Sequence, residues 1–294
     1  MNYQWYPGHM AKAKRMMQEN IKLIDVVIEL VDARIPFSSK NPDIDRLANG
    51  KSRVILLNKY DMADQGKTNA WKAYFENKGY FAALVNSKNG TGVKQVKDIV
   101  FKACEAKIER DRKRGILNRP VRAMVVGIPN VGKSTFINSF VGKASTKTGN
   151  KPGVTKGKQW IRLNNNIELL DTPGILWPKF EDQAVGLKLA LIGSINDTII
   201  NTTELSLELI RFLSTSYPGA LEERYGLEPF GLLEDMTGAA YVLEQIALKR
   251  GCLIKGGEAD LDRAALLVLD DFRSLKLGNI SLEAPEAKRT PAEE

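Results

Sequence analysis

A glycine-rich segment between a predicted strand and a predicted helix constrains the fold of this chain more than any other feature. Residues 127–134 read G-I-P-N-V-G-K-S, which matches the pattern G-x-x-x-x-G-K-S. A β-branched run at residues 121–126 precedes the segment, and residues 133–141 have the composition of a helix. Glycines in this position let backbone N–H groups approach phosphate oxygens closely, and the helix points its amino terminus at them. The segment therefore predicts a phosphate-binding loop in an α/β sheet.

Two further motifs accompany this loop in an unusual order. N-K-Y-D at residues 58–61 matches N-K-x-D, which reads guanine, and D-T-P-G at residues 171–174 matches D-x-x-G, which senses the γ-phosphate. An ordinary GTPase runs phosphate loop, D-x-x-G and then N-K-x-D. Here N-K-x-D comes first and D-x-x-G comes last, which predicts a GTPase with circularly permuted motifs. The D-x-x-G segment leads directly into the C-terminal third of the chain.

The apolar pattern predicts an α/β domain followed by an all-α domain. Strands are predicted at residues 26–31, 54–57, 82–85, 121–126, 160–163 and 167–170. Helices are predicted at residues 10–22, 64–78, 93–114 and 133–141, with a short helix opening at Asn41 and Pro42. Alternating strands and helices indicate a sheet covered on both faces, and each motif follows the carboxyl end of a strand, where such sheets bind ligands.

Three segments follow from this pattern. Residues 1–177 form the predicted GTPase domain, with residues 1–22 as an N-terminal arm. Residues 178–280 form the all-α domain, with helices expected at 183–192, 204–216, 233–250 and 258–274 and with no catalytic constellation. Residues 281–294, rich in Pro, Ala and Glu, are predicted to be a disordered tail.

The net charge of +8 is unevenly distributed. Residues 1–177 carry 31 Lys and Arg against 15 Asp and Glu, whereas residues 178–280 carry 10 against 16. Such a basic domain favours a polyanionic partner such as nucleic acid, and the alternative is a solvated basic surface. The two cysteines, Cys104 and Cys252, are too few and too far apart for a disulfide framework or a metal site.

A basic loop connects the nucleotide motifs. Residues 143–162 contain six basic side chains and no acidic one: Lys143, Lys147, Lys151, Lys156, Lys158 and Arg162. We expect this loop to order when GTP binds, so that the nucleotide state controls a surface for RNA phosphates. Trp5, Tyr6 and Trp160 are candidates for stacking on unpaired bases, and the alternative is that each lies in the core.

The motifs assign specific chemical roles. Lys133 is predicted to reach the β- and γ-phosphates, Ser134 to supply its hydroxyl oxygen to Mg²⁺, and Asp171 to hold Mg²⁺ through a water molecule. The Gly174 amide would contact the γ-phosphate. Thr155 is the preferred second Mg²⁺ hydroxyl, with Thr146 and Thr148 as alternatives in the same loop.

Guanine recognition depends on residues from two strand ends. Asp61 can accept hydrogen bonds from guanine N1–H and its 2-amino group, which adenine does not offer, and Lys59 covers the base. Asn86 and Ser87, at the next strand end, fit the loop behind the guanine O6. The complete set of GTP-binding candidates is Asn58, Lys59, Tyr60, Asp61, Asn86, Ser87, Asn130, Val131, Gly132, Lys133, Ser134, Thr135 and Gly174.

The residue that would orient the hydrolytic water is absent from its usual place. Many signalling GTPases have Gln just after the D-x-x-G glycine, and this chain has Ile175, which cannot hydrogen-bond to water. His9, the one histidine of the chain, follows a Pro-Gly turn and is our candidate to orient or activate that water. The catalytic candidates are thus His9, Lys133 and Thr155, and the alternative for His9 is an RNA-contacting or structural role.

These motifs together resemble the circularly permuted YlqF/RbgA ribosome-assembly GTPases. The resemblance covers nearly the whole chain and rests on Q-W-Y-P-G-H-M at residues 4–10, D-A-R at 32–34, N-K-Y-D at 58–61, G-I-P-N-V-G-K-S-T at 127–135 and D-T-P-G-I-L-W-P at 171–178. It implies a bacterial factor that matures the large ribosomal subunit and is stimulated by it. It also implies an apolar residue in place of the catalytic Gln, as at Ile175, and hydrolysis that uses His9.

The resemblance also implies partners and ions. Asn130 matches the phosphate-loop Asn of K⁺-stimulated GTPases, so K⁺ is a candidate cofactor beside Mg²⁺. The C-terminal domain is implied to contact ribosomal RNA, and its net negative charge places that contact on a local basic face around Lys249 and Arg250. The expected partners are GTP or GDP, the large subunit with its RNA, and ribosomal proteins.

Two other functions compete with this interpretation. One is a nucleotide-gated signalling switch that acts on a protein partner, which Ile175 permits. The other is the GTPase subunit of an RNA-modifying enzyme, although the sequence has no second catalytic motif. The N-terminus lacks the apolar run of a signal peptide and no stretch is long enough to span a membrane, so we expect a soluble, cytoplasmic protein, with monomer as the default state.

Overall fold

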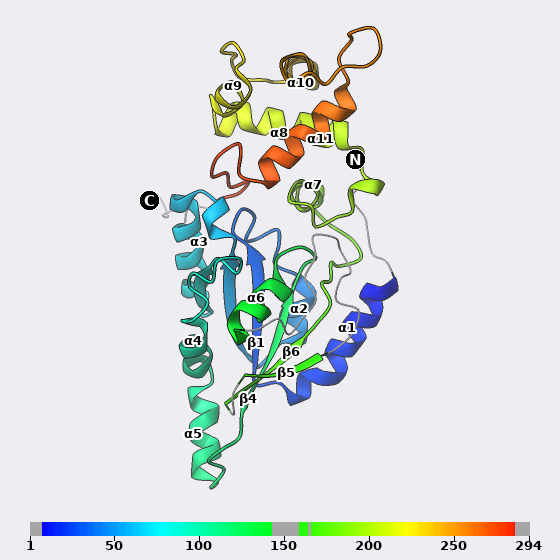
Figure 1. Cartoon of the computed structure of the whole chain (residues 1–294). Coiled ribbons are helices and arrows are strands. Elements are labelled where there is room, and N and C mark those ends of the chain that lie inside the picture. Colours follow the sequence, from blue (N-terminus) through cyan, green and yellow to red (C-terminus); the bar gives the residue numbers. More distant parts are fainter. Residues whose placement is uncertain (1–7, 143–158, 164–165, 286–294) are drawn as a thin grey trace, which may run out of the picture. The chain divides into compact units, whose positions relative to one another are not determined.

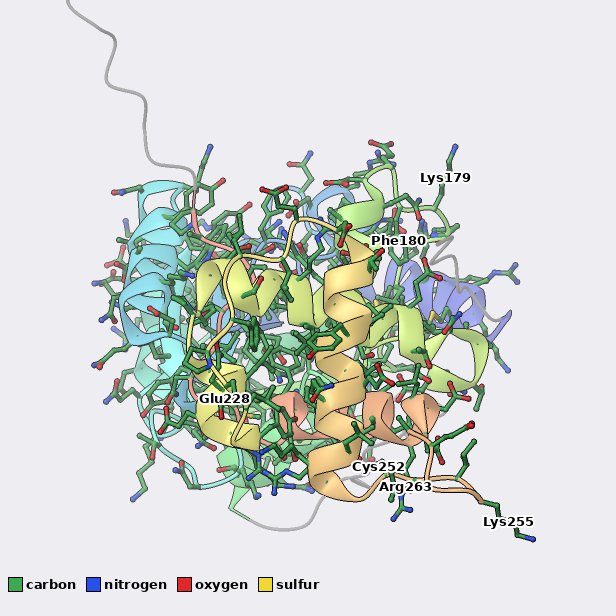
Figure 2. All side chains as sticks on the ribbon, turned by 90° about the horizontal axis from the view of Figure 1, so that it is seen from above. Lys179, Phe180, Glu228, Cys252, Lys255 and Arg263 are labelled. Carbon is green, nitrogen blue, oxygen red and sulfur yellow. The ribbon has the colours of Figure 1, made fainter. Side chains whose placement is uncertain are left out.

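The computed structural model describes residues 8–142, 159–163 and 166–285 of the chain (Figure 1). These residues form two compact units, one of residues 180–280 and one of residues 8–179 together with 281–285. Lys179 and Phe180, labelled in Figure 2, are the last and first residues of the two units at that junction. Within the described ranges, no helix is both long and apolar enough to cross a membrane.

A six-stranded sheet forms the centre of the α/β unit. Its strands are β1 (Val26–Asp32), β2 (Ser52–Asn58), β3 (Phe81–Val85), β4 (Val121–Gly127), β5 (Gln159–Leu163) and β6 (Ile167–Asp171). The order across the sheet is β3-β2-β1-β4-β6-β5, and every neighbouring pair is parallel except β5 and β6. All seven residues of β1 are buried, as expected for a parallel strand covered on both faces. The predicted α/β sheet is confirmed.

Helices of the α/β unit connect these strands. They are α1 (Gly8–Asn20), α2 (Pro42–Leu47), α3 (Gln65–Asn77), α4 (Val96–Ala103), α5 (Glu105–Lys113) and α6 (Lys133–Val141), with short 3₁₀ turns η1 (Ile21–Leu23) and η2 (Tyr60–Met62). Helices α3 and α4 contact β2 and β3, and α6 contacts β4 and β6. The short helix predicted at Asn41 and Pro42 is present, and the Asn41 side chain caps it by accepting from the Asp43 N–H.

The single helix predicted at residues 93–114 is wrong, because α4 ends at Ala103 and α5 begins at Glu105. Cys104 lies between them with its side chain buried and its backbone outside the helical region. Helix α4 buries Val96, Val100 and Ala103, whereas α5 buries no residue and continues beyond the ends of the strands (Figure 1). The change in packing surface explains the break.

The other unit is all-α, as predicted. Its elements are α7 (Gln183–Leu191), η3 (Asp197–Ile199), α8 (Thr202–Ser216), α9 (Ala220–Tyr225), α10 (Met236–Arg250) and α11 (Leu261–Arg273). Helices α8, α10 and α11 pack against one another. Side chains of Asp182, Asn201, Asp235 and Asp260 cap α7, α8, α10 and α11 by accepting backbone N–H groups. Helix α9 was not predicted, because six residues between glycines show too little periodicity.

A buried carboxylate ties α11 to α9 within this unit. Asp271 is fully buried, and its carboxylate accepts from Arg224 Nε at 2.9 Å, the Tyr225 hydroxyl at 3.2 Å and Lys276 Nζ at 2.9 Å. Burial by itself would raise the pKa of Asp271, but hydrogen bonds from Arg224 and Lys276 bring it below its usual value. The charge is therefore retained inside the unit.

Residues 281–285 are bound to the α/β unit, in contrast to the disordered tail expected from residue 281. We call them the C-terminal strap. The Glu283 carboxylate accepts from the Ser38 hydroxyl at 2.6 Å, and also from the backbone N–H groups of Phe37 and Ser38. The Leu282 N–H donates to the Arg34 carbonyl at 2.9 Å. The helical unit is consequently an insertion, joined to the α/β unit before residue 180 and after residue 280.

Candidate nucleotide-binding site

The predicted phosphate loop connects β4 to α6, as its mechanism requires. Asn130 and Gly132 have φ values of 59° and 97°, in the left-handed region. A Cβ atom on Gly132 would lie 2.5 Å from Asn58 Nδ2, so the loop has no room for a side chain there. Helix α6 begins at Lys133 immediately after the loop, so the N–H groups of its first turn point toward the loop.

Lys133 is held inside the loop. Its Nζ donates to the carbonyls of Gly127 at 3.0 Å and Ile128 at 2.9 Å, and the residue is only 7% exposed. Burial lowers the pKa of Lys133 to about 8, and the nearby Asp171 carboxylate partly offsets this effect. A phosphate oxygen entering the loop would meet a cation that is already positioned and poorly hydrated.

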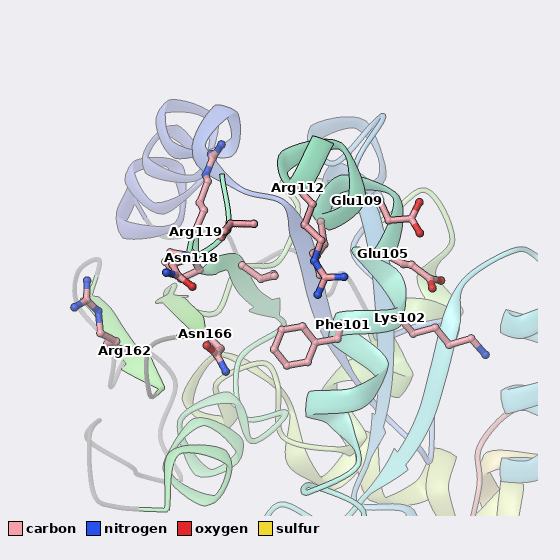
Figure 3. Close-up of a pocket in the computed structure, with 13 residues that line it drawn as sticks. Phe101, Lys102, Glu105, Glu109, Arg112, Asn118, Arg119, Arg162 and Asn166 are labelled. Carbon is pink, nitrogen blue, oxygen red and sulfur yellow. The ribbon is translucent and has the colours of Figure 1, made fainter. Parts of the chain in front are cut away.

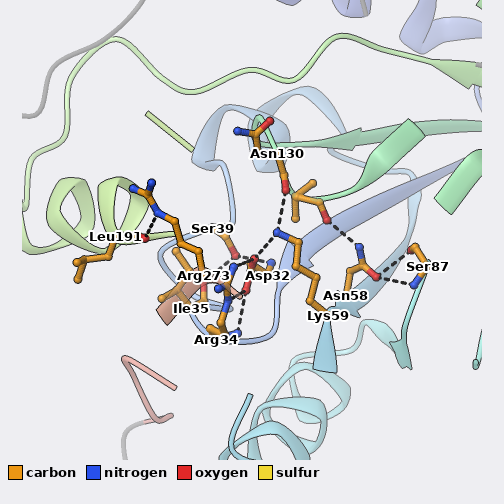
Figure 4. Close-up of polar contacts among 11 residues, drawn as sticks. Asp32, Arg34, Ile35, Ser39, Asn58, Lys59, Ser87, Asn130, Leu191 and Arg273 are labelled. Atoms are coloured by element: carbon orange, nitrogen blue, oxygen red, sulfur yellow. Dashed lines mark hydrogen bonds and ion pairs between the residues drawn. The ribbon is translucent and has the colours of Figure 1, made fainter. Parts of the chain in front are cut away.

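Asn58, the first residue of N-K-x-D, joins three segments at the carboxyl edge of the sheet (Figure 4). Its Nδ2 donates to the Val131 carbonyl at 2.7 Å. Its Oδ1 accepts from the backbone N–H of Ser87 at 3.0 Å and from the Ser87 hydroxyl at 2.8 Å. Asn86 supports the same loop, because its Oδ1 accepts from the Lys88 and Asn89 N–H groups. The structure thus brings the predicted guanine and phosphate loops together.

Lys59 is fixed by a carboxylate to which the sequence analysis gave no role. Its Nζ donates to the Asn130 carbonyl at 2.8 Å and lies 3.0 Å from Asp32 Oδ2. Asp32 also accepts two side-chain hydrogen bonds from Arg34, at 2.9 and 2.8 Å, and both residues are at most 2% exposed. Burial would raise the pKa of Asp32, but the charges of Arg34 and Lys59 hold it far below its usual range. The D-A-R sequence at residues 32–34 was the feature that could have indicated a role for Asp32.

Asp61 and Asp171 occupy opposite environments. Asp61 lies in η2 and is exposed, where a base could reach it. Asp171, at the end of β6, is 1% exposed, and burial raises its pKa to about 6, offset in part by Lys133 and the Thr172 backbone. Both Asp171 carboxyl oxygens are buried, and neither accepts a hydrogen bond from another described residue.

Gly174 fits closely against the phosphate loop. A Cβ atom there would lie 2.9 Å from Lys133 Nζ and 2.9 Å from Pro129 Cα. The Thr172 hydroxyl donates to the Val125 carbonyl at 2.7 Å, which fixes the start of the D-x-x-G segment to β4. The D-x-x-G and phosphate-loop segments therefore form one surface around Lys133.

Comparison with known proteins agrees with this assembly. Residues 122–218 match the family model described as "50S ribosome-binding GTPase". A ribosome biogenesis GTPase A from Bacillus cereus is 48% identical over 97% of this chain and 95% of its own length. The chain belongs to the ribosome biogenesis GTPase A family.

Solved structures of this family have the same fold. GDP-bound TM YlqF has a TM-score of 0.65 and 28% identity, over 93% of this chain and all of that one. GNP-bound YlqF from T. maritima has a TM-score of 0.62 and 30% identity, over 94% and 99%. Family membership shows that the chain is a GTPase that acts in ribosome assembly.

The residues of this ribosome biogenesis GTPase fit the Mg²⁺ that GTPases generally use. Asp171 offers two buried carboxyl oxygens that lack full hydrogen bonds, and Ser134 follows Lys133 in the first turn of α6. Hard oxygen atoms are the ligands that Mg²⁺ prefers, together with phosphate oxygens and water. Among the described residues no three His, Cys, Asp or Glu side chains gather to hold a metal without a nucleotide. Thr155, with its alternatives Thr146 and Thr148, lies outside the described residues.

Ile175 is buried beside the phosphate loop. Its side chain is 1% exposed, its carbonyl accepts from Asn41 Nδ2 at 3.2 Å, and its N–H donates to the Gly127 carbonyl at 3.4 Å. Asn41 therefore caps α2 and holds the D-x-x-G segment, a second role that no local pattern indicated.

The first turn of α1 lies against the D-x-x-G segment. Met10 is fully buried, and its sulfur accepts from the Leu176 N–H at 3.4 Å. His9 precedes Met10 in α1, so its backbone is anchored beside the site, while its side chain is outside the described residues. Trp5 and Tyr6 are outside them as well.

Of the RNA-contact candidates that the structure describes, Trp160 and Arg250 contact other residues of the protein, whereas Lys249 is exposed. Trp160 is 39% exposed on β5 rather than in the core, with the Arg122 guanidinium 5.7 Å from its ring centre. In the helical unit, Arg250 donates to the Arg224 carbonyl and lies over the Tyr225 ring, whereas Lys249 is exposed. Figure 2 shows Lys255, which is exposed, at the outer end of the loop between α10 and α11.

Proposed function

We propose that this GTPase binds the immature large ribosomal subunit in its GTP state and that hydrolysis to GDP and phosphate drives or checks a late assembly step and the protein's own release. The observation that carries the proposal is the 48% identity to a ribosome biogenesis GTPase along nearly the whole chain, together with motifs assembled at one sheet edge. We place this activity in the cytoplasm and expect a monomer.

Guanine specificity follows from Asp61 and its neighbours. The exposed Asp61 carboxylate would accept from guanine N1–H and its 2-amino group, which adenine does not offer. Lys59, held by Asp32 and Asn130, supplies a flat aliphatic surface for the base. Asn58 and Ser87 link that surface to the phosphate loop, so base and phosphates are read together.

Hydrolysis uses charges that are already in position. Lys133 would exchange its two carbonyl acceptors for phosphate oxygens, and the Gly174 amide would contact the γ-phosphate. Ser134, Asp171 and Thr155 would hold Mg²⁺, which would neutralise charge that develops on the phosphates. Asn130 is the candidate ligand for an additional K⁺.

The hydrolytic water requires a group other than Ile175. His9 is the proposed residue, supported by the anchoring of Met10 beside Leu176. The ribosomal subunit would align His9, so we expect turnover to be slow for the protein alone and faster with the subunit. Loss of the γ-phosphate would free the D-x-x-G segment, which continues within twelve residues into α7 of the helical unit.

The test is GTP turnover by the full chain in potassium buffer, with and without large ribosomal subunits. A large rise with subunits is expected. GTP binding without any rise would overturn the proposal and favour a signalling switch that acts on a protein. A steep fall in subunit association between 50 and 200 mM salt is also expected, and a flat response would exclude RNA as the main contact.

A further inference from the structure

A pocket lies at the end of the sheet opposite the nucleotide motifs (Figure 3). Its volume is about 1000 Å³, and Pro120, Val121 and Asn166, at the amino ends of β4 and β6, form part of its wall. The nucleotide motifs follow the carboxyl ends of the same strands. Seven-residue β4 spans about 20 Å at roughly 3.3 Å per residue, so the pocket is a separate site.

Arginines from separate segments border this pocket. Figure 3 shows Arg112 on α5, Arg119 on the segment before β4 and Arg162 on β5. Arg162 pairs with Glu168 at 2.9 Å. Arg112 and Arg119 are exposed and have no side-chain hydrogen bond or ion pair with another described residue. Two guanidinium groups are thus available to a ligand.

The surrounding surface is basic and exposed. Lys102, Lys113 and Arg114 lie on the same helices or just after them and are all exposed, whereas Lys107 is engaged by Asp25 and Asp111. Acidic groups close to the pocket are Glu105 and Glu109 on α5, and the pKa of nearby Asp111 is lowered, chiefly by its hydrogen bond from Lys107 and further by Arg119 and Arg114. Basic groups outnumber acidic ones on this surface.

Exposed arginines and large apolar side chains lie side by side at this pocket. Leu117, which lines the pocket, is 75% exposed, and neighbouring Ile116 is 43% exposed. Helix α5 buries no residue fully, and its contact with the rest of the unit includes the Lys107–Asp25 ion pair. Planar guanidinium groups match phosphate oxygens with paired hydrogen bonds, which favours a nucleic-acid backbone over an acidic protein.

We propose that this α5 surface, comprising α5, residues 114–120 and the adjoining pocket, binds the sugar–phosphate backbone of RNA. The inference rests on the proposed function, because the RNA would be that of the large subunit. Since the surface lies about 20 Å from the nucleotide motifs, its contribution to affinity is the same with GTP and GDP. The protein would hold RNA here while the nucleotide end changes state.

The experiment compares two variants of the full chain that lose equal charge. Arg112→Ala with Arg119→Ala removes the two pocket arginines that are not paired with Glu168. The control is Lys72→Ala, on α3, with Lys78→Ala, just after it. Binding to large ribosomal subunits, and to RNA extracted from them, is measured from 50 to 300 mM salt with GDP and with a non-hydrolysable GTP analogue. Turnover of GTP without subunits should be unchanged in both variants, which confirms folding.

The pocket variant should bind both probes roughly 50-fold more weakly near 0.1 M salt, with the slope of log affinity against log salt reduced by about 2. The loss should be equal with both nucleotides, and the control should bind like wild type. An unchanged slope, or equal losses in both variants, overturns the proposal. Weaker binding to subunits with normal binding to extracted RNA would indicate a protein contact and also overturn it. If wild-type protein binds neither probe, the proposed function fails instead.

Discussion

Lys59 donates to the backbone carbonyl of Asn130 at 2.8 Å, although 71 residues separate them along the chain. The contact joins the guanine-reading motif to the phosphate loop. In an unpermuted order the same two loops would meet in the same way, because parallel strands place both at one sheet edge. Permutation changes which segments are linked covalently and leaves the site intact.

Crowding at Gly132 predicts a loss of nucleotide binding on substitution. Gly132→Ala would bring a Cβ atom 2.5 Å from Asn58 Nδ2 at a φ of 97°, so the loop must distort. We expect GTP affinity to fall at least 100-fold, as measured by fluorescence of a labelled nucleotide. Gly142→Ala is the matched control, because its φ is 75° and nothing lies within 4 Å. It should cost about 1–2 kcal/mol of stability and leave affinity unchanged. Equal affinity losses would refute the steric argument.

The buried Asp32–Arg34 pair predicts coupled losses of stability and binding. Asp32→Asn removes the charge that balances Arg34 and positions Lys59, leaving a buried guanidinium uncompensated. Breaking such a pair costs about 3–5 kcal/mol, and GTP affinity should also fall. Urea unfolding and nucleotide titration measure the two effects. Lys72→Ala, which breaks the exposed pair with Glu76, should change stability by about 0.5 kcal/mol or less. A similar small effect for Asp32→Asn would contradict this role.

Much of this site could be predicted because its motifs are local. The phosphate loop needs glycines at fixed spacing between a strand and a helix, and N-K-x-D and D-x-x-G need particular side chains at strand ends. Asn41 and Glu283 could not be assigned in this way, because each acts through contacts with distant segments that leave no local pattern. Asp32 lies in the D-A-R sequence at residues 32–34, but its contact with Lys59 joins distant segments and could not be read from that sequence.

The errors in the fold have similar causes. The apolar spacing of α4 continues the helical pattern into α5, so the break at Cys104 depends on where the sheet ends and not on propensity. The C-terminal strap has the composition of a disordered segment, and its order comes from Glu283 accepting N–H groups of the residue 33–39 loop.

The Glu283 contacts predict local protection of the loop at residues 37 and 38. Glu283→Ala removes the acceptor of the Phe37 and Ser38 N–H groups and the Ser38 hydroxyl. We expect faster amide exchange in this loop and a stability loss of about 1–3 kcal/mol. Exchange monitored by mass spectrometry gives the local readout. Glu258→Ala, an exposed residue of the helical unit, should leave loop exchange unchanged. Unaltered exchange in Glu283→Ala would show that the strap does not hold the loop.

Asp271 predicts how the stability of the helical unit depends on pH. Its folded pKa lies below the unfolded value of about 3.9, so the ionised carboxylate stabilises the folded state above that pH. The contribution is lost as pH falls below about 4 and the folded group becomes protonated. Thermal unfolding from pH 2.5 to 7 should show this loss in wild type, and Asp271→Asn should be less stable at pH 7 with a flatter acid response. The exposed Glu244→Gln should retain the wild-type profile, and a wild-type slope in Asp271→Asn would exclude this origin.

The anchoring of α1 predicts that substitutions at His9 and Met10 lower GTP turnover without weakening GTP binding. His9→Ala should abolish subunit-stimulated GTP turnover while GTP affinity and subunit binding remain within about twofold, because the proposed contact is to the attacking water. Met10→Ala tests the position of His9, since it removes the buried side chain whose sulfur accepts from Leu176. It should lower stimulated turnover in part and reduce stability by about 2–5 kcal/mol. Single-turnover kinetics with saturating subunits separates the chemical step from binding. Normal stimulated turnover in His9→Ala would exclude His9 from the chemistry and direct the search to a group supplied by the ribosome.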